Sequence, residues 1–204
     1  MIYNRWYRGG VGVPPITRYS KDKIIEIGLK LVEKSGIESI SARNIAKELG
    51  CSICPVFSYF ESMEVLKREL LEKMYEIYSN YVKENMSKCD KPFKGAGIGY
   101  INFAKCHKNY FKALFMSNVN GDLSSLLSGD KNNDDMEIFV SSQYGVSKEM
   151  ARKLHEYCWV FVHGIASMIA TDYCNFSDDE ISEMLSVHYI SLLEKFKREN
   201  VLWK

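Results

Sequence analysis

The sequence contains no long hydrophobic run. No stretch approaches the roughly 18 consecutive apolar residues that a membrane-spanning helix needs. The opening residues 1–15, MIYNRWYRGGVGVPP, also lack the apolar block of a secretory signal peptide. These absences argue against the membrane-spanning class and predict a cytoplasmic protein with no membrane partner.

The cysteines are few and are spread along the sequence. Six cysteines are distributed over 204 residues, unlike the closely spaced cysteines of a small secreted domain that is held together by disulfides. We therefore expect reduced thiols that serve mostly as small apolar side chains. Good strand candidates are missing as well, which favours an all-α fold.

The net charge of +1 is small, but it is unevenly distributed. Residues 1–60 contain nine Lys and Arg against five Asp and Glu, whereas the remaining residues contain 18 against 21. A basic front end on a slightly acidic body suits contact with a polyanion through that end.

The residues that are present form a succession of helical patterns. Hydrophobic residues make up 46% of the sequence, which is enough for a substantial core. Ser20, Ser41 and Ser177 stand at N-cap positions, and Gly36 stands where a helix should end. The patterns predict about nine helices, over residues 21–35, 42–49, 53–59, 62–86, 96–109, 110–118, 134–144, 147–174 and 178–198.

Three segments lack this periodicity. Residues 1–16 are rich in Gly and Pro and predict an extended arm. Residues 90–99, DKPFKGAGIG, interrupt the helical pattern and predict a seam between two domains. Residues 120–133 are rich in Gly, Asp, Asn and Ser and predict a loop.

Residues 41–60 fit a helix-turn-helix. Ala46 is the small residue that lets two helices cross closely, and Gly50 occupies the turn position that needs a positive φ. Ser52 is expected to cap the second helix, and Pro55 is tolerated in its first turn because N–H groups there have no intrahelical partner. This register buries Ile45, Leu49, Cys51, Val56 and Tyr59.

The same register decides between two uses of Cys51 and Cys54. A Cys-x-x-Cys pair invites redox or zinc chemistry. Here, however, Cys51 should face the core while Cys54 lies on the outer face of the second helix, so the two thiols diverge too far for a disulfide or a shared metal. We expect no metal and no cofactor.

Residues 17–71 resemble the DNA-binding domain of the TetR-type transcriptional regulators. The resemblance rests on KIIEIGLKLVEKSG, SARNIAKELGCS and FSYFESMEVL at the spacing of that family, and WVFVHGIASMI at 159–169 is similar to a segment of some C-terminal domains. It implies a DNA-binding domain over 17–71 and a ligand-binding and dimerisation domain over 72–204. The expected partners are double-stranded DNA, a small-molecule effector and a second copy of the chain, as in a bacterial repressor on a palindromic operator.

Two positions depart from the family pattern. Phe57 stands where the family usually has Tyr, and Met63 stands where it usually has Lys. Both family residues typically contact DNA phosphates, so two backbone anchors are missing and DNA binding should be weaker unless other basic residues compensate.

The resemblance implies that the second helix of the motif enters the major groove. Because Ile53, Cys54 and Pro55 are mostly apolar, contact with thymine methyl groups is favoured over bidentate reading of guanine. The expected DNA-contacting residues are Ser41, Arg43, Asn44, Lys47, Ser52, Ile53, Cys54, Pro55, Phe57, Ser58 and Tyr59.

The C-terminal helices provide candidates for an effector pocket and a dimer interface. Aromatic residues at helical spacing can be plain core as well as pocket, and both interpretations stay open. The pocket candidates are Phe103, His107, Phe111, Phe115, Met116, Tyr144, Tyr157, Phe161 and His163. The interface candidates on the last two helices are Trp159, Val162, Ala166, Met184, Val187, His188, Ser191 and Leu192.

One alternative belongs to a different functional class. His155 and Cys158 share a helix face at i and i+3, as a cysteine-dependent sensor or enzyme would require. Such chemistry needs a thiolate beside a base, and the sequence shows no further group that supplies it. We therefore expect a regulator and not an enzyme.

Overall fold

The computed structural model describes residues 19–116 and 131–202. The expected arm over 1–16 lies outside them, as does most of the expected loop over 120–133. The described residues form nine α-helices and one 3-10 turn, with no strand among them, which confirms the all-α expectation. The elements are α1 (Lys21–Ser35), η1 (Ile37–Ser39), α2 (Ala42–Leu49), α3 (Cys54–Tyr59), α4 (Met63–Lys88), α5 (Pro92–Cys106), α6 (Lys108–Phe115), α8 (Lys131–Tyr144), α9 (Lys148–Ala170) and α10 (Asp178–Leu202).

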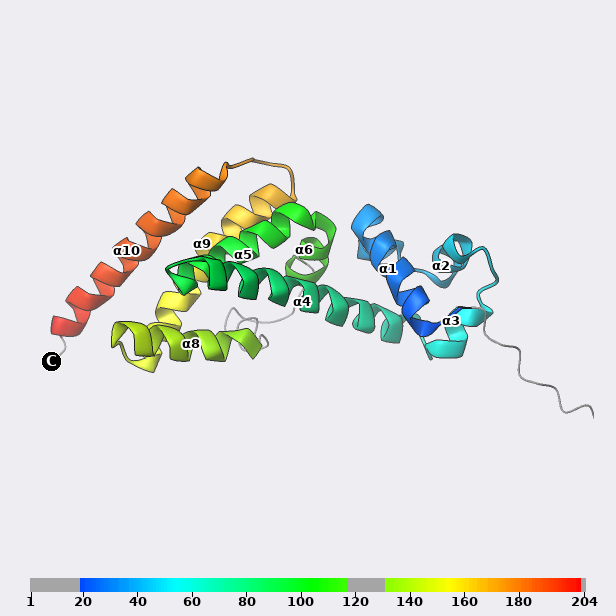
Figure 1. Cartoon of the computed structure of the whole chain (residues 1–204), viewed down its shortest axis with the longest axis horizontal. Coiled ribbons are helices and arrows are strands. Elements are labelled where there is room, and N and C mark those ends of the chain that lie inside the picture. Colours follow the sequence, from blue (N-terminus) through cyan, green and yellow to red (C-terminus); the bar gives the residue numbers. More distant parts are fainter. Residues whose placement is uncertain (1–18, 117–130, 203–204) are drawn as a thin grey trace, which may run out of the picture.

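The molecule is elongated. Figure 1 shows α1, α2 and α3 at one end, and α8, α9 and α10 at the other, with the long helix α4 running between them. α5 lies along the C-terminal half of α4, and α6 lies close to α1. The N-terminal helices are therefore joined to the rest of the chain by both α4 and α6.

Side-chain caps start the N-terminal helices where the sequence predicted. Ser20 Oγ accepts a hydrogen bond from the Lys23 N–H at 3.1 Å, and Ser41 Oγ accepts one from the Asn44 N–H at 3.2 Å. Each bond satisfies an N–H group that has no partner inside its helix. Gly50 then ends α2 with φ 65° in the left-handed region, as the turn requires.

The expected cap of α3 is wrong. α3 begins at Cys54, its N-cap is Ile53, and no side chain caps it, so Ser52 does not have the predicted role. Ile53 already has a right-handed helical backbone at φ −73° and ψ −12°, so the chain enters the helix through a turn rather than from an extended serine. Pro55 lies in the first turn as predicted.

The interruption expected over residues 90–99 is shorter than predicted, because only residues 89–91 separate α4 from α5. α5 begins at Pro92 and runs through this stretch. Gly95 and Gly99 face α4. A Cβ atom added at Gly95 would lie 2.5 Å from the Asn85 carbonyl oxygen, and a Cβ atom added at Gly99 would lie 2.7 Å from the Tyr81 carbonyl oxygen. These glycines permit two helix backbones to approach closely rather than breaking a helix. The predicted domain boundary at residue 71 falls inside α4.

The remaining helix ends differ from expectation by a few residues. His107 separates α5 from α6, two residues earlier than predicted. α8 begins at Lys131 rather than 134. The predicted capping box at the start of α10 is confirmed, because the Glu180 N–H donates to Ser177 Oγ at 3.2 Å and the Ser177 N–H donates to Glu180 Oε2 at 2.8 Å.

The hydrophobic core has two parts. The larger one begins among the N-terminal helices, with residues such as Ile45 and Val56, and continues along α4 into the body through Leu70 and Phe103. The smaller one gathers Phe93, Met136, Leu154 and Phe196 where α5, α8, α9 and α10 meet. Across the described ranges, no helix combines the length and apolar character needed to span a membrane.

The glycine contacts between α4 and α5 generate a stability prediction. Gly99→Ala should lower the free energy of unfolding by about 1–3 kcal/mol, because the new methyl would press on α4 backbone atoms that cannot move aside. Gly164→Ala in α9 is the matched control: no atom lies within 4 Å of its Cβ position, so it should be neutral or stabilise by up to about 1 kcal/mol. Urea unfolding of both variants measures the difference, and equal effects would contradict the packing of α5 on α4.

Candidate nucleic-acid interface and internal cavity

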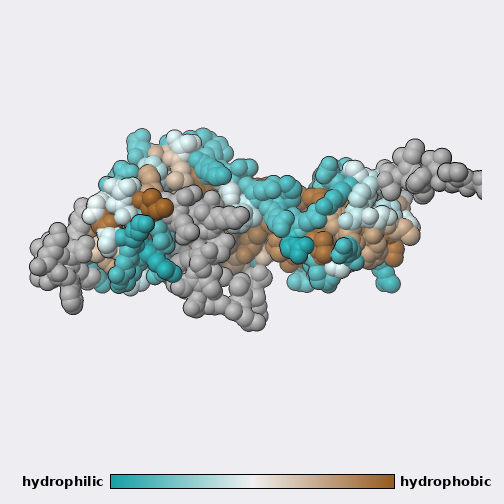
Figure 2. Space-filling view, turned by 90° about the horizontal axis from the view of Figure 1, so that it is seen from below, coloured by the Kyte–Doolittle hydropathy of each residue, from teal (hydrophilic) through white to brown (hydrophobic). Residues whose placement is uncertain are grey.

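The α2–α3 unit is held from inside by three buried side chains. Ile45 and Leu49 of α2 and Val56 of α3 belong to the larger core. Because these residues fix both helices, the opposite face of α3 points outward. Two large apolar side chains of this face are exposed, Ile53 at 44% and Phe57 at 48%. Figure 2, which shows the underside of the view in Figure 1, has hydrophobic residues at the surface of this end of the molecule.

Basic and polar side chains of the same helix-turn-helix are exposed as well. Arg43 and Lys47 on α2 are exposed, and neither forms an ion pair within the described residues. Ser52, Cys54 and Ser58 are exposed as predicted.

Several of the predicted DNA-contacting residues already form hydrogen bonds or packing contacts within the chain. The Asn44 side-chain amide donates to the Ser39 carbonyl at 2.7 Å, and the Ser58 hydroxyl donates to the Cys54 carbonyl at 2.9 Å. Ser41 caps α2, and Tyr59 packs half-buried against the core. Pro55 is half-buried too. The side chains with most surface to offer are therefore those of Arg43, Lys47, Ile53, Cys54 and Phe57.

Met63 occupies the family's lysine position for a packing reason. The Ser62 hydroxyl caps α4 by accepting from the Val65 N–H at 3.3 Å. Met63 follows this cap, and its half-buried side chain packs against the core of the N-terminal helices. The Met63 side chain therefore makes an apolar contact inside the chain.

The cysteines of the motif diverge as predicted. Cys51 is half-buried, packs against the core and donates its S–H to the Ser52 carbonyl at 3.2 Å, whereas Cys54 is exposed. Both are free thiols. In the part of the chain that the structure describes, no group of three His, Cys, Asp or Glu side chains is placed to hold a metal ion.

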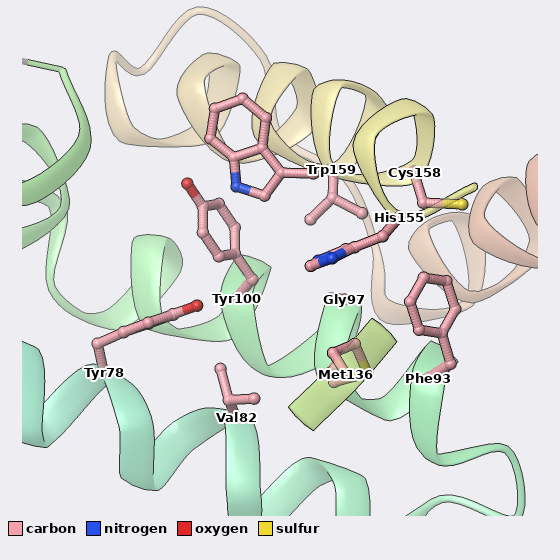
Figure 3. Close-up of a pocket in the computed structure, with 11 residues that line it drawn as sticks. Tyr78, Val82, Phe93, Gly97, Tyr100, Met136, His155, Cys158 and Trp159 are labelled. Carbon is pink, nitrogen blue, oxygen red and sulfur yellow. The ribbon is translucent and has the colours of Figure 1, made fainter. Parts of the chain in front are cut away.

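An internal cavity lies between α4, α5, α8 and α9 (Figure 3), with a volume of about 70 Å³. Its walls are mostly apolar and aromatic. The lining residues are Tyr78, Val82, Phe93, Ala96, Gly97, Tyr100, Met136, His155, Cys158, Trp159 and Val162.

None of the predicted pocket residues lines this cavity. Phe103 and Phe111 are fully buried in the larger core, where Phe115 also packs. Met116 and Tyr157 are exposed, Tyr144 packs against Tyr189, and Phe161 stacks on His188 with ring centroids 4.1 Å apart. Helical periodicity identifies apolar faces, but it does not reveal which of them is left incompletely filled. The adjacent small residues Ala96 and Gly97 are the sequence signal that could have indicated this cavity, because small side chains leave room beside larger neighbours.

His163 connects the cavity wall to α6. Its Nδ1 is hydrogen-bonded with the Tyr100 hydroxyl at 2.9 Å, and its ring stacks on Trp159 at 4.8 Å between centroids. The other side of the ring packs against Phe111 of α6 at 5.7 Å. Burial lowers the pKa of His163 below its usual value, which favours the neutral ring.

His107 connects α6 to α1. Its Nδ1 lies 3.1 Å from Glu33 Oε2 of α1, and its Nε2 lies 3.3 Å from the Tyr81 hydroxyl of α4. Two neighbouring side chains of α6 form hydrogen bonds with the α1 backbone. Asn109 Nδ2 donates to the Glu33 carbonyl oxygen at 2.7 Å, and the Tyr110 hydroxyl donates to the Leu29 carbonyl oxygen at 3.0 Å. The end of α1 is thus tied to the start of α6 by side-chain hydrogen bonds.

The predicted dimer residues divide into two groups. Val162 and Ala166 are buried inside the chain's own core and are removed from the expected interface. Val187 of α10 is 60% exposed, Ser191 is exposed, and Trp159, Met184, His188 and Leu192 are half-buried. Ile190, which the sequence also places among the apolar residues of these helices, is 47% exposed, and Val160, which the sequence reasoning missed, is 50% exposed. Val160 therefore leaves part of α9 uncovered within the single chain.

Comparison with solved structures identifies the architecture. A TetR variant from Acinetobacter baumannii AYE in complex with minocycline has a TM-score of 0.55 at 13% identity and is matched over 89% of this chain and 98% of its own. A TetR family protein from Vibrio parahaemolyticus, described as a putative transcriptional regulator, has a TM-score of 0.54 at 15% identity, over 83% of this chain and 96% of its own.

The chain has the TetR-type fold. The resemblance predicted from the sequence is thereby confirmed at the level of the fold. A protein of unknown function from Rhodococcus sp. RHA1 shares this fold, with a TM-score of 0.68 at 15% identity over 89% of this chain and 98% of its own.

Comparison of sequences gives a consistent result. An uncharacterised HTH-type transcriptional regulator of Mycobacterium tuberculosis is 23% identical over 170 residues, which cover 80% of this chain and 78% of that protein. No family model matches the sequence.

The alternative use of Cys158 as a reactive thiol has a physical obstacle. Cys158 is buried against the cavity, and burial raises its pKa to about 12. At pH 8 the thiolate fraction is then on the order of 10⁻⁴, far too small for a nucleophile of the kind that cysteine enzymes use.

Thiol reactivity tests this placement. At pH 8, iodoacetamide should modify the exposed thiols of Cys54 and Cys106 readily, while Cys158 stays unmodified until the protein is unfolded. Peptide mass spectrometry after timed quenching gives the rate at each cysteine. Fast modification of Cys158 in the native protein near pH 7 would instead support the sensor or enzyme alternative.

Proposed function

We propose that this protein is a sequence-specific DNA-binding transcriptional regulator, a repressor that acts as a homodimer and releases DNA when a small molecule enters its C-terminal domain. The observation that carries the proposal is the outer face of α3, where Ile53 and Phe57 are exposed beside Arg43 and Lys47 on a helix-turn-helix. The similarity to an HTH-type regulator supports the same function.

The exposed face of α3 is suited to contact with base edges in the major groove of DNA. An α-helix fits the major groove, where thymine presents a methyl group that apolar side chains contact. Ile53, near the start of α3, is placed to make such a contact, and Phe57 lies one turn further along the helix. Arg43 and Lys47 lie four residues apart on α2 and supply cations for the phosphates on either side of the groove.

Selection from a random pool of duplex DNA tests the proposal directly. A dimer with two equivalent recognition helices requires an operator with two-fold symmetry. We expect an enriched palindrome with A·T pairs at the positions that Ile53 and Phe57 reach. A pool without any enriched sequence would contradict the proposed function.

Two substitutions on this face should have different effects. Lys47→Ala should weaken binding to all duplexes about equally and reduce the slope of log Kd against log salt by about one unit, because one phosphate partner is lost. Ile53→Ala should instead relax the preference at one base position of the selected operator, at a cost of about 1–3 kcal/mol. Titrations at two salt concentrations measure both. An unchanged salt slope for Lys47→Ala would show that α2 is placed wrongly on the DNA.

The proposed homodimer uses the open sides of α9 and α10. Val160, Val187 and Ile190 are large, exposed and apolar on two neighbouring helices. Large apolar side chains exposed on neighbouring helices are typical of an interaction site, and a second copy of the chain would cover them by a two-fold repeat of the same face.

Charge placed on this surface should separate the two subunits. Val187→Asp should raise the dimer dissociation constant by at least tenfold, because the carboxylate would lose water in the interface. Ile138→Asp is the matched control, since Ile138 is 55% exposed on α8 and lies outside the proposed interface. Sedimentation velocity over a range of concentrations compares them. If both variants dimerise like the unmodified protein, the interface lies elsewhere.

The release of DNA would pass from α9 and α5 through α6 to α1. Tyr100 and Trp159 in the cavity wall contact His163, and His163 packs on Phe111 of α6. The start of α6 is bonded to α1 by the Asn109 and Tyr110 side chains. A ligand that binds one arrangement of these helices more tightly would shift the population of the N-terminal helices, and by linkage the affinity for DNA.

A further inference from the structure

The cavity between α4, α5, α8 and α9 has walls without formal charge. None of its lining residues in the described part of the chain is Lys, Arg, Asp or Glu. The charged groups nearest along the sequence, such as the half-buried Lys94 and Glu156, are hydrogen-bonded to Ser182 and Arg152 respectively. An ion that entered would lose its hydration without gaining a partner of opposite charge, which is strongly unfavourable.

The wall also contains the buried titratable side chains of Cys158 and His155. Burial raises the pKa of Cys158 to about 12, so it remains a neutral thiol. His155 is buried, with its ring packed edge-on against Phe93 at 6.1 Å between centroids. The other polar atoms of the wall belong to the Tyr78 and Tyr100 hydroxyls and the Trp159 indole, all of which are neutral donors near pH 7.

Aromatic rings dominate the shape of the cavity. Figure 3 shows Tyr78, Phe93, Tyr100 and Trp159 arranged around the same space, with Met136 of α8 across from them. Aromatic walls favour a flat ring, which can stack or pack edge-on against them. Methionine is unbranched and flexible, so the Met136 side chain can move aside to enlarge a cavity of about 70 Å³.

We propose that this cavity binds a small, uncharged molecule with a single aromatic ring. The role of this molecule as the effector rests on the function proposed above, but its binding does not. Because Tyr100 and Trp159 also contact His163, the ring of the ligand would touch the same two side chains that lead to α6.

Calorimetric titration of the full-length protein with three probes of similar size tests the proposal. Benzyl alcohol is neutral, benzoate is an anion and benzylammonium is a cation. Benzyl alcohol should bind at least tenfold more tightly than either ion. Equal affinities, or no binding of benzyl alcohol at millimolar concentration, would overturn the proposal.

Two substitutions in the cavity wall test whether benzyl alcohol binds in the cavity. Gly97→Val should weaken benzyl alcohol binding at least tenfold, because Gly97 lines the cavity and its Cβ position lies 3.3 Å from Val162 Cγ2. The same substitution at Gly164, which has no atom within 4 Å of its Cβ position and does not line the cavity, should leave binding unchanged. Met136→Ala enlarges the cavity and should tighten binding several-fold, which keeps the test decisive if Gly97→Val does not fold.

Binding that survives in Gly97→Val and is unaffected by Met136→Ala would locate the probe elsewhere and overturn the proposal. The titrations contain no DNA, so their failure leaves the proposed DNA binding untouched. Conversely, a random DNA pool without enrichment would leave a positive titration standing.

Discussion

The continuous apolar stripe of α4 is the constraint on which the rest of the structure depends. Leu66 and Leu70 at its N-terminal end are fully buried against the N-terminal helices, while Tyr78 and Val82 are buried against α5. Each such side chain contributes about 1.5–3 kcal/mol on burial, so neither end of α4 can detach cheaply. One helix is therefore part of the core beneath the helix-turn-helix and also part of the cavity wall.

Because α4 belongs to both regions, a change in the cavity wall can influence the position of α3, although the cavity lies far from α3. α5 is held on α4 by backbone contacts at Gly95 and Gly99, and the loss of this close approach would displace the cavity wall. The second connection runs through polar groups instead, from His163 through α6 to the hydrogen bonds at Glu33 and Leu29. Close packing and directional hydrogen bonds both resist small shifts, so motion should be transmitted as a rearrangement of whole helices.

The sequence was most informative where local chemistry determines structure. The Ser20, Ser41 and Ser177 caps and the turn at Gly50 follow from short-range rules and were predicted correctly. The glycines of 90–99 were misread, because the same residue breaks a helix in one context and permits close helix packing in another. The cavity was missed because its existence depends on which side chains from four helices fail to fill a common space, and no single periodicity encodes that.

A hydroxyl-radical footprint of the protein on its selected DNA tests the central claim most directly. If α3 of each subunit enters the major groove of a two-fold complex, the backbone should be protected in two symmetric half-sites whose centres lie about one helical turn, or a whole number of turns, apart on the same side of the duplex. Ile53→Ala should leave this protection pattern in place. A single asymmetric protected patch, or protection without fixed spacing, would contradict the account.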